Sequence, residues 1–344
     1  MGVKINELVP AREIGFRQLS GKVIAVDSSL FLYQFLTTIR QPDGTLLMDS
    51  KGRVTSHLVG LFSRTARLMQ YGLKLCYVFD GEPPKFKHQE QQRRHDLKEE
   101  AKEKYKAAVE REDIEEMSKY AKRTVSLSKE MIEESKELVA ALGLPVVQAP
   151  SEAEAQAAHM VRKQDAFALA TQDADALMFG ATRIVRNLSL VGKRKQTNRL
   201  SYQNVQPELV ELSNTLNLLG IDQDQLIALC MLVGTDYNPG GIKGIGPKNA
   251  LRLVQQYGKG FDKLFESVEW SKNFDTNWSE IFNLIKKMPV TDKNALKWKS
   301  VDSDEISKLL IDRHDFSSER VESTLQKLLR EKETKQQKGL GDFL

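Results

Sequence analysis

Short apolar runs alternate with amphipathic stretches over the first 80 residues, which is the pattern of an α/β unit. Val23–Val26 and Leu75–Phe79 are continuous apolar runs, typical of strands buried on both faces of a parallel sheet. Apolar residues at helical spacing predict helices over 30–36 and 58–69, the second ended by Gly72. We therefore predict an α/β fold with a mostly parallel central sheet and helices on both faces.

A similar pattern returns after residue 128. It predicts one helix and three short strands, over 129–142, 145–148, 166–170 and 183–185. Ser151 is expected to cap a helix that begins with Glu152 and Glu154. Beyond residue 205 the pattern is helical, interrupted by a glycine-rich stretch at 240–246, and we expect the last dozen residues to be disordered.

Charge is concentrated between residues 81 and 140. This stretch holds 14 Lys/Arg and 15 Asp/Glu, while the segments on either side are more apolar. Its apolar residues form two sparse helical stripes, one around Leu97 and Ala101 and one around Met117 and Ala121. Because so few apolar side chains cannot hold a helix in a large core, we expect a helical excursion that leaves the main body, or a partly mobile one.

Composition excludes several kinds of site. The 344 residues include 51 Lys+Arg and 47 Asp+Glu, for a formal charge of +4, which alone does not decide whether nucleic acid is a partner. No stretch reaches the roughly 18 consecutive apolar residues of a membrane span, and the N-terminus lacks a secretory apolar region, so we expect an intracellular protein. Cys76 and Cys230 both lie in apolar runs. We therefore exclude a disulfide framework and expect no zinc site built on cysteines.

Three predicted buried strands end in acidic residues, Asp27, Asp80 and Asp173. The carboxyl edge of an open α/β sheet is where ligands bind, so these three side chains can share one site. Clustered carboxylates need cations, and all-oxygen ligands favour Mg²⁺ or Mn²⁺, which suit hydrolysis of a phosphate ester. An Asp after a strand is also common as a turn residue or helix cap, and both interpretations stay open on pattern alone.

Six stretches together resemble the flap endonucleases, structure-specific 5′ nucleases of DNA replication and repair, in an archaeal form. They cover most of the chain in the family's order and read VDSSLFLYQFL (26–36), TSHLVGLFSRTARLM (55–69), YVFDGEPPKFK (77–87), APSEAEAQAA (149–158), TQDADALMFG (171–180) and GTDYNPGGIKGIGPKNA (234–250). The resemblance implies a helical arch over the site and a helix-turn-helix element that binds duplex DNA.

The resemblance also implies two Mg²⁺ ions, with Mn²⁺ as an alternative. The residues implied to hold the first ion are Asp27, Asp80, Glu152 and Glu154. Those implied to hold the second are Asp173, Asp175 and Asp236. Lys87 and Arg94, about two helical turns apart, are implied to contact the scissile phosphate and complete the catalytic set.

Further residues match positions that contact DNA in the family. Tyr33 matches an aromatic residue that stacks on an unpaired base; unaided, it reads as a core aromatic. The other implied DNA contacts are Arg40, Arg64, Arg67, Glu152, Gly234, Asp236, Lys243, Gly244, Gly246, Lys248 and Arg320. Arg320 lies in a segment resembling one that recognises a one-nucleotide 3′ flap, although His314 stands where a relative has Lys. The glycine-rich turn is implied to bind K⁺; without the surrounding match it could be a plain connector.

The C-terminal tail resembles a sliding-clamp binding box, with Leu344 in place of the second aromatic residue. Its implied clamp-binding residues are Gln337, Leu340, Phe343 and Leu344, the alternative being a disordered apolar end. We expect a monomer with no membrane partner, acting with DNA and, if archaeal, in the cytoplasm. The regions expected are a nuclease region at 1–98, a charged arch at 99–128, an internal nuclease region at 116–258 with the helix-turn-helix element at 234–255, a C-terminal helical region at 259–335 and the tail at 336–344.

The predicted function is cleavage at the base of 5′ flaps by two-metal phosphodiester hydrolysis, with 5′-3′ exonuclease activity on nicked or gapped duplex. The predicted roles are Okazaki fragment maturation and base-excision repair. Two alternatives remain. One is an exonuclease or a bubble-cutting repair nuclease of the same superfamily, and the other is a non-catalytic junction binder or clamp adaptor.

Overall fold

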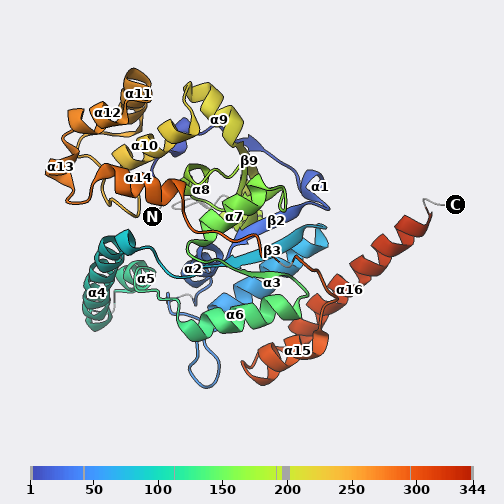
Figure 1. The fold of residues 1–344 in the computed structure, drawn as a ribbon. Helices are drawn as coiled ribbons and strands as arrows, with labels where there is room; N and C mark the ends of the chain where they lie inside the picture. Colours follow the sequence, from blue (N-terminus) through green and yellow to red (C-terminus); the bar gives the residue numbers. More distant parts are fainter. Residues whose placement is uncertain are drawn as a thin grey trace.

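The computed structural model describes residues 3–41, 43–111, 113–190, 192–195, 202–294 and 296–341. Seven strands form the central sheet in the order β1-β9-β6-β5-β2-β3-β4. Helices lie on both sides of this sheet (Figure 1). The strands are β1 (Arg12–Glu13), β2 (Val23–Asp27), β3 (Lys74–Phe79), β4 (Val146–Gln148), β5 (Ala168–Ala170), β6 (Arg183–Arg186) and β9 (Glu208–Glu211). The five from β6 to β4 are parallel, whereas at one edge β9 pairs antiparallel with β6, and β1 pairs antiparallel with β9. The prediction of a mostly parallel sheet is confirmed.

The sheet separates two hydrophobic cores because alternate residues of each strand point to opposite faces. In β2, Ala25 belongs to one core, and Ile24 and Val26 belong to the other. β3 shows the same alternation, with Cys76 on the first face and Tyr77 on the second. Both faces of these strands are apolar, which is why the central strands are continuous apolar runs in the sequence.

Helices cover both faces. The core that contains Ala25 is completed by α7 (Ala153–Arg162), α8 (Asp175–Met178), α9 (Leu212–Leu219), α10 (Gln223–Val233), α11 (Pro247–Tyr257), α12 (Phe261–Ser267), α13 (Trp270–Asn273) and α14 (Trp278–Lys286). The other core includes side chains from α1 (Phe16–Leu19), α2 (Ser28–Thr38), α3 (Ser56–Gln70), α6 (Lys129–Ala141), α15 (Ser303–Ser307), the π-helical turn η4 (Lys308–Asp312) and α16 (Ser318–Gly341). The helices predicted from apolar spacing within the first 150 residues are therefore present.

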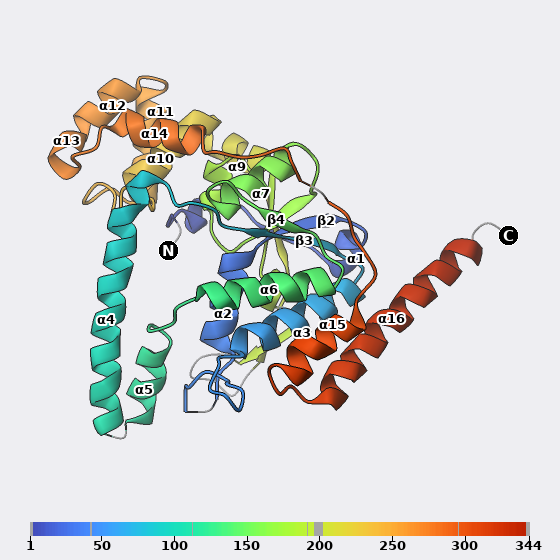
Figure 2. The ribbon, with the colours of Figure 1, turned by 60° about the horizontal axis from the view of Figure 1, so that its bottom comes forward.

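Two highly charged helices stand off the main body. The 3₁₀ turn η2 (Lys85–Lys87) leads into α4 (His88–Glu110), and α5 (Ile114–Ala121) returns beside it (Figure 2). Ala101, Ala108 and Ala121 are buried in this small pair, whereas Leu97 is 46% exposed. The sparse apolar residues hold the two helices against each other rather than in a large core, as the pattern predicts. The division of the chain at 99–128 stays a prediction.

Two local expectations are wrong. Glu152, not Ser151, is the N-cap residue of α7, because the Ser151 hydroxyl donates instead to the carbonyl oxygen of Glu82 (2.9 Å). The chain beyond residue 205 is not purely helical, since β9 completes the sheet. No clear apolar pattern marks four further elements. They are the hairpin strands β7 (Gly192–Lys195) and β8 (Tyr202–Val205) and the 3₁₀ turns η1 (Asn6–Leu8) and η3 (Leu188–Leu190).

The C-terminal segment is more ordered than the sequence predicts. Val321 and Leu325 bury the first turns of α16 against the body, and the helix then continues outward to Gly341 (Figures 1 and 2). The expected disorder of the last dozen residues is therefore wrong as far as Gly341. No single described helix is long and apolar enough to cross a membrane; only the bent pair α9 and α10 passes that test jointly, and α10 is buried in the core.

Candidate active site

The parallel strands deliver three acidic side chains to one edge of the sheet. Asp27 is the last residue of β2 and the N-cap of α2, and its side chain accepts a hydrogen bond from the backbone N–H of Leu30 (3.2 Å). Asp80 directly follows β3, which pairs with β2 so that Asp27 lies opposite Val78. Asp173 follows β5 on the other side of β2. The predicted convergence of strand ends is confirmed.

Four more acidic residues reach the same place from helix termini and a tight turn. Glu152 and Glu154 begin α7, and Asp175 is the first residue of α8. Asp236 follows α10 in a turn whose backbone is fixed because the Thr235 hydroxyl donates to the side-chain oxygen of Asn238 (2.6 Å). We call these seven side chains the carboxylate cluster: Asp27, Asp80, Glu152, Glu154, Asp173, Asp175 and Asp236.

Mutual repulsion and burial shape the electrostatics of the carboxylate cluster. Burial, followed by the charge of Asp80, raises the pKa of Asp27 from 3.8 to about 8. Burial is also the main cause that raises the pKa of Asp175 to about 7, and it raises the pKa of Glu154 together with the charges of Asp175 and Asp27. The pKa of Asp173 is raised as well, first by burial. The carboxylate cluster thus lacks enough positive charge to stabilise all of its ionised forms.

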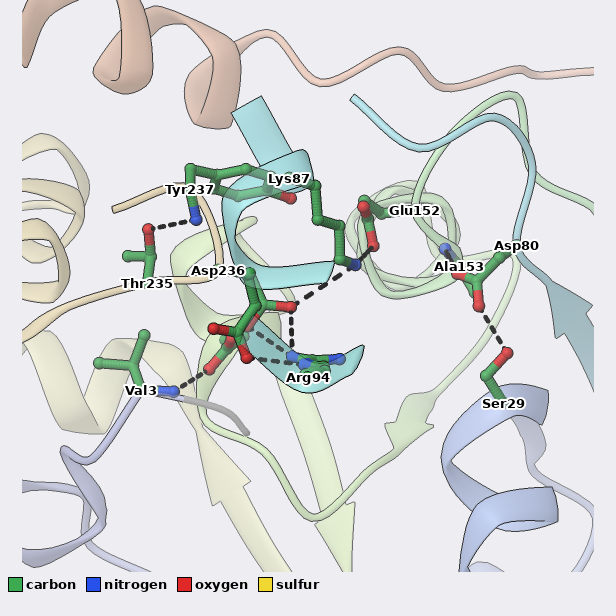
Figure 3. A network of polar contacts seen from close by, with 12 residues as sticks. Val3, Ser29, Asp80, Lys87, Arg94, Glu152, Ala153, Thr235, Asp236 and Tyr237 are labelled. Atoms are coloured by element: carbon green, nitrogen blue, oxygen red, sulfur yellow. Dashed lines mark hydrogen bonds and ion pairs between the residues drawn. The ribbon is translucent and has the colours of Figure 1, made fainter. Parts of the chain in front are cut away.

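Two positively charged side chains, Lys87 and Arg94, partly compensate the negative charge of the carboxylate cluster (Figure 3). Arg94 donates through one terminal nitrogen to both carboxylate oxygens of Asp236 at 2.8 Å. Lys87 Nζ lies 2.6 Å from Glu152 Oε2 and 3.5 Å from Asp236 Oδ2. Burial alone would lower the pKa of Lys87, but the charges of Glu152 and Asp236 outweigh burial and raise it. The pKa of Glu152 is also raised, because the effect of its burial outweighs the opposing charge of Lys87. Both predicted cations therefore face the carboxylate cluster, although Lys87 lies in η2 rather than in α4.

Several supporting contacts are absent from the sequence-based site. The Ser29 hydroxyl donates to Asp80 Oδ2 (2.5 Å), and the Ala153 N–H donates to the other oxygen (2.8 Å). The Val3 N–H donates to Asp175 Oδ1 (2.5 Å), and the Thr171 hydroxyl donates to Glu154 Oε1 (3.0 Å). The only sequence signal for Ser29 and Thr171 is that each stands two residues from an acid of the carboxylate cluster.

The chemistry of the donor set fits hard divalent cations. All seven side chains offer oxygen ligands, and the raised pKa values of Asp27 and Asp175 indicate acids that a bound cation would stabilise in the ionised form. As the described side chains stand, no three His, Cys, Asp or Glu residues are arranged to hold a metal ion. Carboxylate oxygens at this site form ion pairs with Lys87 and Arg94, those of Glu152 with Lys87 and those of Asp236 with Arg94.

Comparisons with known proteins decide the family. A model described as the XPG N-terminal domain matches residues 2–101, and the XPG I-region matches residues 143–236. Flap endonuclease 1 of Pyrococcus abyssi is 50% identical over 328 residues, which cover 95% of this chain and 94% of the relative. The chain belongs to the flap endonuclease family. It is therefore a nuclease of a metal-dependent family.

Solved structures agree with this membership. The flap endonuclease-1 structure from Methanococcus jannaschii matches with a TM-score of 0.75 and 41% identity, covering 97% of this chain and all of the other. The catalytic core of Rad2 in complex with a DNA substrate matches with a TM-score of 0.67 and 25% identity over 92% of this chain and 96% of the other. The fold around the carboxylate cluster is thus the family's fold.

The glycine-rich turn that resembles the family's duplex-binding element joins α10 to α11. Gly234 has a φ of +112°, and a Cβ there would lie 2.6 Å from the backbone nitrogen of Gly241, so only glycine fits. Gly244 and Gly246 have open space where a Cβ would be, and Lys243 and Lys248 are exposed. Gly246 is the N-cap of α11, whose first N–H groups are therefore available to an anion. Binding of K⁺ and DNA by this turn stays a prediction.

The predicted contacts in the first 70 residues differ in their exposure. Tyr33 is 42% exposed on α2, so reading it as a core aromatic would be wrong, and its stacking on a base stays a prediction. Arg64 and Arg67 lie on α3 close enough that Arg67 contributes to lowering the pKa of Arg64, after burial. Arg40 donates to the carbonyl oxygens of Leu36 (2.9 Å) and Gly44 (2.6 Å), which gives it a structural role beside any contact with DNA.

The predicted DNA-binding and clamp-binding residues near the C-terminus differ in where they lie. Arg320 is exposed in the first turn of α16, and His314 is buried. Gln337 and Leu340 lie within α16, but their side chains are outside the description. Phe343 and Leu344 lie outside the described residues.

Proposed function

We propose that the protein cuts 5′ flaps at their base during Okazaki fragment maturation and base-excision repair, with 5′-3′ exonuclease activity on nicked or gapped duplex. The observation that carries this proposal is the carboxylate cluster itself: acids from separate strand ends, helix termini and a turn meet one lysine and one arginine. Membership of the flap endonuclease family supports the substrate.

We assign two Mg²⁺ ions to the carboxylate cluster, the first to Asp27, Asp80, Glu152 and Glu154 and the second to Asp173, Asp175 and Asp236. When bound, these ions would supply a water of lowered pKa and neutralise charge at the scissile phosphodiester. Ser29 and the Ala153 N–H hold Asp80 in position, and the Val3 N–H holds Asp175. The acids are thereby oriented before any ion arrives.

Lys87 and Arg94 act on the phosphate. Both side chains already reach the acids at which hydrolysis is expected, and each carries hydrogen-bond donors that can turn from a carboxylate to a phosphate oxygen. Positive charge placed where negative charge develops lowers the barrier of phosphoryl transfer. The products are a 5′-phosphate and a 3′-hydroxyl.

Substrate selection uses surfaces around this site. The α10–α11 turn, with Lys243 and Lys248, would bind the backbone of the duplex through N–H groups and charge. Tyr33 would stack on an unpaired base, and the 5′ single strand would pass beside α4 and α5. The combination of a duplex grip and a single-strand passage favours a flap over continuous duplex.

A labelled double-flap duplex tests this proposal against its alternatives. In Mg²⁺ we expect one cut at the flap base, and in EDTA intact DNA. Stepwise release of mononucleotides would instead support an exonuclease. Cutting of a bubble in preference to the flap would support a repair nuclease. Intact DNA in Mg²⁺, with binding retained, would support a junction adaptor. Glu133→Gln, an exposed substitution on α6, is the control variant and should cut normally.

The C-terminal tail is proposed to bind a sliding clamp through Gln337, Leu340, Phe343 and Leu344. The first half of α16 anchors to the body and the second half extends away from it, which would present the tail to a partner (Figure 2). Phe343→Ala should lower affinity for a purified trimeric clamp by about tenfold or more, whereas Asp342→Ala should change it little. Equal affinities would contradict clamp binding; cleavage without clamp should be unchanged.

A further inference from the structure

Glu90 is a buried acid in the first turn of α4. Although α4 is charged throughout, Glu90 is only 3% exposed. Two other acids of this helix, Glu99 and Glu100, make the same kind of one-turn ion pair, but their side chains are 49% and 54% exposed. Such surface pairs contribute little to stability, whereas a buried carboxylate must have partners. The position of Glu90 therefore needs a separate explanation.

The partners of Glu90 are the two arginines one turn further along the helix. Its Oε1 accepts hydrogen bonds from Nε of Arg94 (2.7 Å) and from a terminal nitrogen of Arg93 (2.8 Å), and its Oε2 accepts from Nε of Arg93 (2.6 Å). Burial alone would raise the pKa of Glu90, but the hydrogen bonds and charges of Arg93 and Arg94 lower it to about 2. Glu90 is thus ionised at neutral pH.

Nε of Arg94 contacts Glu90, whereas a terminal nitrogen of Arg94 contacts a residue outside α4. One terminal nitrogen of Arg94 reaches both oxygens of Asp236 (Figure 3). Arg94 is therefore held from two sides, by Glu90 on its own helix and by Asp236 in the carboxylate cluster. Asp236 is assigned to bind metal, whereas Glu90 is not. Glu90 is therefore the partner that Arg94 can keep throughout a reaction.

We propose that Glu90 is a positioning residue for Arg94: its carboxylate fixes the Nε edge of the guanidinium, so that the terminal nitrogens meet the scissile phosphate. This inference rests on the phosphate contact of Arg94 given under the proposed function. Without Glu90, the long side chain samples other rotamers and its donors are misplaced when the phosphate arrives. The loss falls on the rate of cleavage rather than on the affinity for DNA.

A double-mutant cycle tests the inference, with single-turnover cleavage of a 5′ flap in Mg²⁺ and the dissociation constant of the same DNA in EDTA as readouts. Arg94→Ala should slow cleavage by about 10²-fold or more. Glu90→Ala should slow it by about 10- to 100-fold, and Glu90→Gln, which keeps an acceptor oxygen, by less. Affinity should change by less than about threefold in each, and the control Glu133→Gln, which removes an exposed one-turn pair on α6, should match the wild type.

Adding Glu90→Ala to Arg94→Ala should cause no further loss, whereas adding it to Arg93→Ala should cause the full loss. If Glu90→Ala slows cleavage as much in the Arg94→Ala background as in the wild type, Glu90 acts by holding the helix and the inference is overturned, while the role of Arg94 stands. Unchanged cleavage by Glu90→Ala also overturns the inference. Unchanged cleavage by Arg94→Ala overturns the phosphate contact itself, and the inference with it.

Discussion

Asp27 contributes a carboxylate to the carboxylate cluster, and its burial there costs the fold stability. It ends a buried strand, caps α2 and remains 7% exposed, and burial together with Asp80 raises its pKa to about 8. In an unfolded chain its pKa is near 3.8. The folded state therefore keeps this proton to a higher pH than the unfolded state does. Without metal, the contribution of Asp27 to stability falls as the pH rises from about 4 to about 8.

Asp27→Asn should stabilise the metal-free protein at pH 8, because it removes a carboxylate that the fold keeps from ionising freely. We expect the free energy of unfolding to rise by roughly 1–3 kcal/mol at pH 8, with little change at pH 4. Urea unfolding in EDTA at both pH values measures this, with the exposed Asp275→Asn as the control. A variant less stable than the wild type at pH 8 would show that Asp27 is compensated in the fold.

Ser29→Ala should weaken metal binding at the carboxylate cluster, because the Ser29 hydroxyl is a hydrogen-bond donor that orients Asp80. Loss of such a supporting contact commonly costs about 10- to 100-fold in metal affinity or activity. The Mg²⁺ concentration for half-maximal cleavage should rise by about tenfold, and excess Mg²⁺ should restore the rate. An unchanged Mg²⁺ dependence would mean that the Ala153 N–H alone positions Asp80.

At this scale, residues with a fixed relation to an element were predictable. Asp27 and Asp173 were, because apolar runs predict strand ends, and strand ends of a parallel sheet meet at one edge. Glu152, Glu154 and Asp236 required the resemblance to a family. Glu90 was not predicted, because its burial depends on where α4 meets the body and no spacing rule separates it from Glu99.

A buried polar contact links three elements far from the active site. Both ring nitrogens of His314, which follows η4, lie 3.0 Å from carboxylate oxygens, those of Asp49 and of Glu134 on α6. Burial would raise the pKa of Asp49, but hydrogen bonds from Arg53 and His314 lower it to about 2. The turn at 49–53 and the C-terminal segment are thereby joined to α6.

Asp49→Asn should lower the unfolding temperature at pH 7, because the ionised form of Asp49 is favoured by folding. Since its folded pKa lies below the unfolded value of 3.8, this contribution is complete above about pH 5 and is lost as the pH falls toward 2. Thermal unfolding from pH 7 to pH 2 should show the two curves converging at the acidic end. Glu137→Gln, which removes an exposed pair with Arg313, is the control; a constant difference across this range would contradict the account.

Two glycines of the α10–α11 turn, Gly241 and Gly244, should differ in how much the fold depends on them. A Cβ at Gly241 would lie 2.4 Å from the backbone of Val233, whereas one at Gly244 meets open space and only the positive φ of +84° is strained. Gly241→Ala should therefore cost about 3 kcal/mol or more, and Gly244→Ala about 1 kcal/mol. Urea unfolding measures both; equal losses would mean that the turn shifts to accommodate a side chain.

Element prediction worked best where apolar spacing was strong. β2, β3, α3 and α6 were found within one or two residues. β9 was missed because its four residues include two glutamates and its strand form depends on pairing with β6. α16 was expected to be disordered near its end because that stretch is polar, yet its buried first turns start a helix that continues to Gly341.

For the whole molecule, the small net charge hides two opposite requirements. Basic side chains are proposed to contact a phosphate backbone, and acidic side chains gather at one edge of the sheet. Lys87 and Arg94 connect the two by occupying carboxylates that are assigned to metal. Fold and acid positions together are those of a nuclease of a metal-dependent family.

Asp173→Ala gives the most direct test of this account, because Asp173 follows β5 within the carboxylate cluster and is assigned to bind metal. Cleavage of a 5′ flap in Mg²⁺ should fall below about one hundredth of the wild-type rate, while affinity for the same DNA changes by less than about threefold. A variant that binds normally and still cuts faster than that would contradict the assignment of metal-dependent hydrolysis to the carboxylate cluster.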